Sequence, residues 1–255
     1  MHEILFSSVL QLFYRMKQFC MSTQKGIILG ILLSLSLTAV PQTSKPKNMV
    51  MADFQRFHFG YSVGLNTLGF TILQTPAQKQ GYHVALLQNP GININLITDL
   101  RISKFLDLRF LPGIQFGQRD LTVSNNLTKE TKVWKIESVY VDMPLLLKYR
   151  SVRVNNYAPY LIAGVNPRFD LIRAELENFK PATPMLKSFD FYTELGVGVD
   201  FYLAMVKVAV ELKFSVGMLD VFLPPDDPKF NLYSSGISNV YSRMVILAFH
   251  VEQSR

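Results

Sequence analysis

Strict alternation of side chains constrains this sequence more than any other feature. In FYTELGVGVDFYL, residues 191–203, apolar side chains alternate with glycine, acidic residues and tyrosine. Side chains of a strand point to opposite faces in turn, so this stretch predicts a strand with one apolar face. Such a face packs inside a soluble sheet. In an outer-membrane barrel it meets lipid instead, and the small and polar residues line the interior.

The same alternation recurs in seven other segments. The eight predicted strands lie near residues 56–66, 91–97, 106–119, 138–150, 160–170, 190–203, 206–218 and 244–251. Short links near 100–105, 151–156 and 203–205 alternate with long polar connections near 67–88, 120–134, 172–187 and 220–240. Short turns at one end and long loops at the other are typical of outer-membrane barrels. We therefore predict an all-β fold, an eight-stranded antiparallel up-and-down transmembrane β-barrel with both termini in the periplasm.

The polar faces of these strands mix acids and bases with glycine. Seven charged residues are expected to form a polar network in the interior: Arg109, Asp142, Lys148, Arg168, Glu194, Glu211 and Lys213. An eight-stranded barrel is only wide enough for its own side chains, so the mixture favours an ion-paired core over a transport path. A soluble barrel of the lipocalin type would reverse the pattern, with an apolar interior and charged outer faces.

The first part of the chain has the composition of a targeting segment. Residues 26–40, GIILGILLSLSLTAV, form an apolar run that Lys17 and Lys25 precede. This order is typical of a secretory signal peptide, and the run is shorter than the ~20 residues of a spanning helix. We expect a signal peptide over 1–42, of which 1–15 can be an over-extended start. A periplasmic segment over 43–55 and the barrel over 56–252 would follow, and a retained anchor helix is the alternative.

Composition narrows the range of partners. The formal net charge is +7, but the basic residues are scattered through apolar strands, so nucleic acid is not an expected partner. The single cysteine, Cys20, precedes the apolar run and would leave with the signal peptide, so we expect no disulfide. No cofactor, metal ion or small-molecule substrate is indicated. Outer-membrane lipid is the partner that the apolar faces predict.

Two local features carry further expectations. The first and last strands must pair to close the barrel, and His58 and His250 both lie on the inward face. We therefore expect the two histidines to form a pair where these strands meet, near Arg56 and Glu252 at the periplasmic mouth. A hydrogen-bonded plug is the favoured role, and a metal pair is the alternative. Pro144 interrupts a strand and predicts a bulge near Met143–Pro144, because proline lacks a ladder donor.

The middle of the chain resembles a known family. LRISKFLDLRFLPGIQFGQRDL, ESVYVDMPLLLKYRSVRVNNYAPYLIAGVNPRFDL and ELGVGVDFYL are similar to stretches of the PorT family of the Bacteroidetes outer membrane. The resemblance spans roughly residues 56–252, and its most specific part is Glu137–Leu171. It implies a non-enzymatic barrel of the type IX protein secretion apparatus, with other secretion-system subunits as partners and a possible role in gliding motility. It supplies no catalytic residues.

Other classes of small outer-membrane barrel stay open. A rim enzyme acting on lipid or peptide needs a nucleophile and a base, or a pair of acids, at the extracellular mouth. His83, in QKQGYHVALL, is the one histidine that the pattern assigns to a long loop, and no serine near it forms a recognisable motif. We therefore predict no catalytic residues and no enzyme. A structural or adhesion barrel of the OmpA transmembrane type is the third class.

Overall fold

The computed structural model describes residues 47–49, 55–73, 82–125, 131–173, 185–223 and 238–253. These residues all belong to one unit, Pro46–Arg255. The predicted signal peptide over 1–42 lies outside the described residues, as does most of the segment 43–55. Among the residues that the structure describes, no helix is long and apolar enough to cross a membrane.

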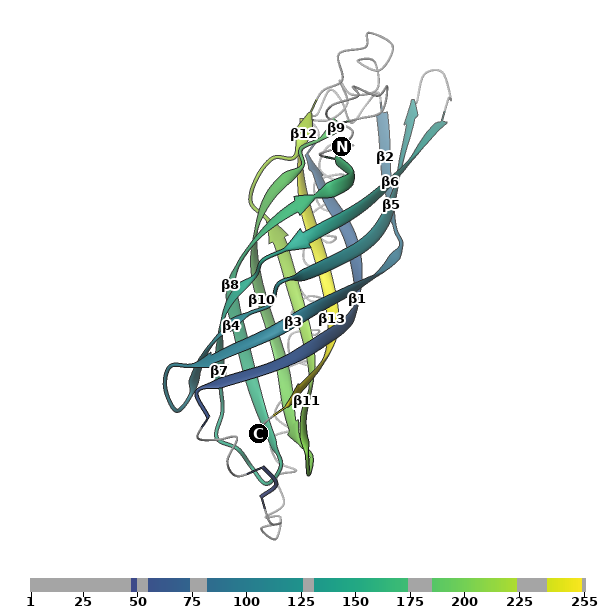
Figure 1. Cartoon of the computed structure of the whole chain (residues 1–255). Helices are drawn as coiled ribbons and strands as arrows, with labels where there is room; N and C mark the ends of the chain where they lie inside the picture. Colours follow the sequence, from purple (N-terminus) through teal and green to yellow (C-terminus); the bar gives the residue numbers. More distant parts are fainter. Residues whose placement is uncertain are drawn as a thin grey trace, which may run out of the picture. The chain divides into compact units, whose positions relative to one another are not determined.

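Antiparallel strands make up nearly all of the described chain (Figure 1). The long strands are β1 (Phe57–Leu73), β3 (Pro90–Arg101), β5 (Gly113–Asn125), β6 (Thr131–Asp142), β8 (Tyr157–Asp170), β10 (Phe189–Tyr202), β11 (Val206–Gly217) and β13 (Asn239–Gln253). The shorter strands are β2 (Tyr82–Gln88), β4 (Leu106–Phe110), β7 (Leu145–Arg150), β9 (Met185–Leu186) and β12 (Phe222–Leu223). Three short strands continue long ones, because β2 leads into β3, β4 into β5, and β6 into β7. The chain thus passes from one end of the barrel to the other eight times, and we call each passage a crossing.

Hydrogen bonding closes these eight crossings into a ring. The order is β1, β3, β4, β7, β8, β10, β11, β13 and again β1, and β5 and β6 extend the ring between β3 and β8. Consecutive crossings are neighbours throughout, which is the up-and-down topology. The predicted eight-stranded antiparallel barrel is confirmed.

One continuous row of outward side chains measures the stagger of the barrel. Following cross-strand partners gives the row Phe116, Ile92, Leu65, Leu247, Leu212, Val197, Leu161, Tyr149 and Leu106. The row starts on β5 and returns to the same crossing on β4, ten residues earlier in the chain. A closed barrel needs such a stagger because its strands tilt against the axis. Every member of the row is apolar or aromatic.

The expected bulge at Pro144 is absent from the described strands. Asp142 pairs with Arg168 and Leu145 with Val165, so the register is the same on both sides of the proline. Pro144 loses only its own donor, while its carbonyl still accepts a hydrogen bond of 3.1 Å from the Leu111 amide. The prediction was wrong because a missing donor interrupts a ladder without requiring an extra residue.

A true change of register lies elsewhere, between β2 and β3. Gln88 pairs with Arg119, whereas Ile92 pairs with Phe116, so one extra residue is accommodated near Asn89. The side chains that face inward therefore change parity at this point, as a β-bulge requires. The outward residues of β3 and the inward residues of β2 are both apolar, and the sequence alone gave no sign of this switch.

The polarity of the wall inverts along several strands. On β5 the outward side chains change from Ile114 and Phe116 to Gln118, Asp120 and Thr122. The inward side chains change the opposite way, from buried Gln115 and Arg119 to buried Leu121 and Val123. On β13 the outward series changes from Val245 and Leu247 to Arg243 and Tyr241, on approaching the long-loop end. The barrel thus has an apolar band on its outer surface. Towards the long-loop end the strands continue beyond this band with polar side chains facing outward and apolar side chains facing inward, and we call this part the wall extension.

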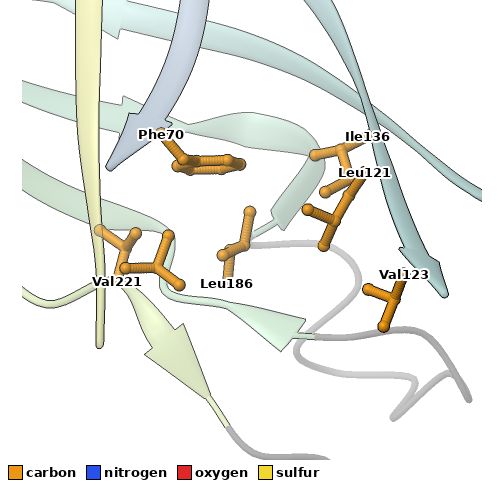
Figure 2. Close-up of a cluster of buried hydrophobic side chains, with 7 residues drawn as sticks. Phe70, Leu121, Val123, Ile136, Leu186 and Val221 are labelled. Atoms are coloured by element: carbon orange, nitrogen blue, oxygen red, sulfur yellow. The ribbon is translucent and has the colours of Figure 1, made fainter. Parts of the chain in front are cut away.

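An apolar cluster occupies the interior of this extension (Figure 2). Its buried members are Phe70, Leu121, Val123, Ile136, Leu186, Val221 and Val240. Leu186 belongs to β9 and Val221 immediately precedes β12, and these two short strands pair with each other in a separate small sheet. Connections from the long-loop end therefore fold back onto the wall strands and cap the interior. The predicted long connections are shorter than expected, since β1 continues to Leu73 and β6 begins at Thr131.

Candidate functional site

The interior of the apolar band holds buried ion pairs on its polar faces. Arg109 of β4 is fully buried and binds the carboxylate of Asp99 on β3 with two hydrogen bonds of 2.7 Å. The same guanidinium reaches Glu211 at 3.2 Å and Glu252 at 3.0 Å. Lys207 of β11 pairs with Glu252 as well. Bidentate pairing of this kind is among the strongest charged contacts in proteins.

A second pair lies beside this group. The Nζ atom of Lys148 is 2.9 and 2.8 Å from the two carboxylate oxygens of Asp200, and neither side chain is exposed. Lys148 also lies over the ring of Tyr160, 3.9 Å from its centroid. The Tyr160 hydroxyl donates a hydrogen bond of 2.9 Å to Glu211, so the ring connects the two groups. Cations over aromatic faces are favourable when they are removed from water.

The third group lies nearer the long-loop end. Arg168 of β8 is 2.9 Å from Asp142 and 2.8 Å from Glu194. Glu194 also pairs with Lys213 at 2.8 Å and accepts hydrogen bonds from Asn166 and Ser215. The carboxylate of Glu194, on β10, thus lies among donors from the two neighbouring strands, β8 and β11. Burying so many charges would cost several kcal/mol each without such partners.

The structure places all seven predicted network residues inside the barrel, and each lies within 4 Å of an opposite charge. It divides them into groups that the sequence did not separate. Sequence reasoning left Asp99 and Glu252 out of the network, although both carry the strongest contacts of Arg109. The signal was present, because Asp99 continues the inward series Asn93, Asn95 and Ile97 on β3.

The two histidines do not form the expected pair. His250 lies opposite Ser62 on β1, and its Nε2 is 3.3 Å from Glu211 of β11. His58 lies opposite Asp99 on the other neighbouring strand, β3. Both histidines are buried, as inward positions should be. The prediction was wrong because the register of β1 against β13 offsets the two residues by four positions along the wall. No cluster of three or more possible metal ligands occurs in the described ranges.

The short-turn mouth is contacted by the residues that precede the barrel. Asn48 donates a hydrogen bond of 2.9 Å from its amide to Asn156 and one of 3.2 Å from its side chain to the Tyr202 carbonyl. Arg153 bonds the Asn48 carbonyl and lies over the Tyr202 ring, 3.9 Å from its centroid. Met49 packs against Ala158 and Tyr202. This segment therefore closes over the turn at 151–156.

At the opposite mouth one aspartate holds the cap in place. Asp220, between β11 and β12, accepts hydrogen bonds from the amides of Phe222 and Val240, at 3.1 and 2.9 Å, and from the Asn239 side chain at 2.8 Å. Slight burial raises the pKa of Asp220, but these three donors outweigh it and hold the pKa below the usual carboxyl range. The carboxylate thus holds the start of β12 against the start of β13.

His83 lies on the outward face of β2 and is exposed. Its cross-strand partner on β5 is Ser124, whose hydroxyl is 3.2 Å from that of Thr131. The sequence suggested that His83 belongs to a long loop, but the structure places it on a strand of the wall extension.

The interior is a packed core of ion pairs. Each of the seven charged residues of the predicted network contacts a side chain of opposite charge.

The sequence match agrees with this architecture. A model of the outer membrane protein beta-barrel domain matches residues 41–223. The chain belongs to this family. The chain is therefore an outer-membrane protein, and the exposed apolar side chains on the outer surface of its barrel face lipid. No curated protein sequence matches the chain.

Solved outer-membrane barrels are similar in structure at low sequence identity. The outer membrane protein OprG from Pseudomonas aeruginosa has a TM-score of 0.46 and 12% identity, covering 79% of this chain and 98% of its own. Neisserial surface protein A has a TM-score of 0.40 and 11% identity, over 76% of this chain and 96% of its own. The outer membrane protease OmpT from Escherichia coli has a TM-score of 0.34 and 9% identity, over 79% and 97%.

Proposed function

We propose that this chain is a non-enzymatic barrel component of a protein secretion apparatus, similar to the PorT family and serving type IX secretion. The observation that carries the proposal is the stretch Glu137–Leu171, in β6, β7 and β8, whose order of residues resembles that of the PorT family. The proposed partners are other subunits of the apparatus, and the proposed orientation has both termini and the short turns in the periplasm. A role in gliding follows only where the apparatus exports surface adhesins.

The packing of the interior supports this role. The charges of the lumen pair with one another, and aromatic rings stack against them. Such a core is a rigid support and not an open path, so the surfaces left for work are the two mouths and the wall extension. A scaffold acts through contacts spread over area, and not through a set of reacting groups.

Deletion of the gene in its native host tests the proposal. The measurement is the amount of a cargo with a C-terminal secretion domain in the medium and in the periplasm. We expect cargo to disappear from the medium and accumulate in the periplasm, and the intact gene to restore export. Unchanged export in the deletion strain would contradict the secretion role.

Complementation separates a scaffold from a rim enzyme. His83→Ala removes the exposed histidine of the wall extension, and it should restore export as well as the intact gene does at equal barrel level. Loss of export from His83→Ala alone, with a folded barrel, would favour an enzyme acting at the extracellular rim.

A further inference from the structure

Two neighbouring strands of the wall extension are not hydrogen bonded to each other. Among the described residues, β1 beyond Thr67 pairs only with β13, and β2 pairs only with β5. The ladder that joins β1 to β3 ends where Thr67 meets Pro90, next to the bulge at Asn89. Among the described residues, no ladder therefore joins β1 to β2 from this point towards the long-loop end, and each strand has one unpaired edge.

The hydrogen-bonding pattern shows which backbone groups lie on these edges. The Asn89 amide donates to Gln118 on β5, and the Arg101 amide donates to Arg56, the residue that precedes β1; these two bonds fix the alternation of backbone groups on β2 and on β1. The groups that point across belong to even-numbered residues. We call this set the β1–β2 edge: the backbones of Leu68, Phe70 and Ile72 on β1 and of Val84, Leu86 and Gln88 on β2.

The β1–β2 edge lies beyond the apolar outer band. Gly69, between Leu68 and Phe70, is opposite Arg243 of β13, whose side chain faces outward. The side chain of Gln88 lies against Gly69, where an added Cβ would be 2.2 Å from its Nε2. A polar amide thus covers this part of the wall. Unpaired backbone groups would cost several kcal/mol each in hydrocarbon, but above the band they are open to a partner.

We propose that the β1–β2 edge binds an extended polypeptide segment by strand addition. Unpaired amides and carbonyls at every second residue are matched by an extended main chain. The inward side chains next to the edge, Leu68, Phe70 and Leu86, are apolar and adjoin the capped cluster. The segment that fits therefore has an apolar residue at every second position and polar residues between them. This proposal does not depend on the secretion role.

Amide hydrogen exchange on the purified full-length barrel in nanodiscs measures the edge directly. The amides of Val84 and Leu86 should exchange freely, and those of His83, Ala85 and Leu87, bonded to β5, should be protected. The probe is a synthetic peptide with the sequence of residues 67–73, TLGFTIL, flanked by lysines for solubility. Its addition should slow exchange at Val84 and Leu86 by about tenfold or more, since a tenfold change corresponds to ~1.4 kcal/mol.

A matched peptide and a matched disulfide are the controls. The same peptide N-methylated at its leucine, phenylalanine and isoleucine positions at 2, 4 and 6 lacks donors on one edge and should give no protection. Thr71→Cys with Ala85→Cys places thiols across the edge, and oxidation should abolish peptide binding. Ala85→Cys with Thr122→Cys joins positions that are already paired on β2 and β5, and it should leave binding intact.

Three results would overturn the proposal. The first is protection of Val84 and Leu86 before any peptide is added, which would mean that β1 and β2 already pair. The second is equal binding of the N-methylated peptide, which would mean adsorption of apolar side chains and not strand addition. The third is an unmodified peptide that gives no protection although the disulfide of positions 85 and 122 forms normally.

Discussion

Lys148 and Asp200 form an ion pair in which neither side chain is accessible to solvent, with Nζ 2.9 and 2.8 Å from the two carboxylate oxygens. The two residues come from β7 and β10, which are separated in the wall by β8. The contact therefore spans β8 on the inner face of the wall and joins two strands that are not neighbours. Pairs of this kind hold together strands that share no backbone hydrogen bonds.

Removing one partner of this pair should destabilise the barrel strongly. Lys148→Met leaves Asp200 as an unpaired buried carboxylate, at a cost of ~3–5 kcal/mol. Adding Asp200→Leu to the same variant should recover part of that loss. Unfolding by urea in lipid vesicles measures both. Lys104→Met, on the exposed turn at 102–105, is the control and should change stability by less than ~0.5 kcal/mol. Equal effects of the two lysine variants would refute a buried pair.

Gly198 leaves room for the ring that connects two ion-pair groups. A Cβ at this position would lie 2.4 Å from Cζ of Tyr160, the residue that donates to Glu211. Gly198→Ala should therefore displace the tyrosine and cost ~1–3 kcal/mol by overpacking. In the double variant with Tyr160→Leu the loss should be smaller than the sum of the two single losses. Strict additivity of the unfolding free energies would show that the two residues are not in contact.

Acid should loosen the cap through Asp220. Its pKa in the folded protein lies below the usual carboxyl range, so its ionised form contributes stability at all pH values above that range. That contribution is lost as the pH falls through the lowered pKa, below pH ~4. Amide chemical shifts of Phe222 and Val240 report the change. In Asp220→Asn the same amides should show no titration in this window, and a persisting titration would assign it to another group.

The loop-length pattern predicts which end of the barrel faces outward. Thr131, at the start of β6, lies at the long-loop end, and Ser103 lies on the short turn between β3 and β4. Thr131→Cys should react with a membrane-impermeant thiol reagent on whole cells. Ser103→Cys should react only after the outer membrane is opened. Reaction of Ser103→Cys on intact cells would reverse the orientation.

Alternation alone predicted the strands of the wall, but only in the part where polar side chains face inward and apolar side chains face outward. It located all eight crossings and the inward charges such as Arg109 and Glu194, because period two survives any change of environment. It ended the first strand at Asn66, since Leu68 and Phe70 point inward and break the polar-inside rule. The strand in fact continues to Leu73 with the rule inverted. A search for alternation of either sign would have found the extension.

Register was the part that the sequence could not supply. The pairing of His58 with His250 and the bulge at Pro144 both required knowledge of which residues lie opposite each other. Register is set by the fit of all neighbouring strands together, and a shift of one residue, as at Asn89, changes the parity of everything beyond it. The contribution of β9 and β12 to the cap likewise depends on contacts between distant segments.

The central claim is that the outward face changes from lipid to water along the same strands, and spin labels on the reconstituted barrel test it most directly. Labels at Leu65 and Leu247 lie in the apolar row, and labels at Thr71 and Thr122 lie in the extension. Electron paramagnetic resonance then compares collisions with oxygen, which concentrates in lipid, and with a water-soluble nickel complex. We predict that oxygen dominates at Leu65 and Leu247 and the nickel complex at Thr71 and Thr122. Greater access of the nickel complex at Leu65 and Leu247 would contradict the account, because it would place the apolar row in water.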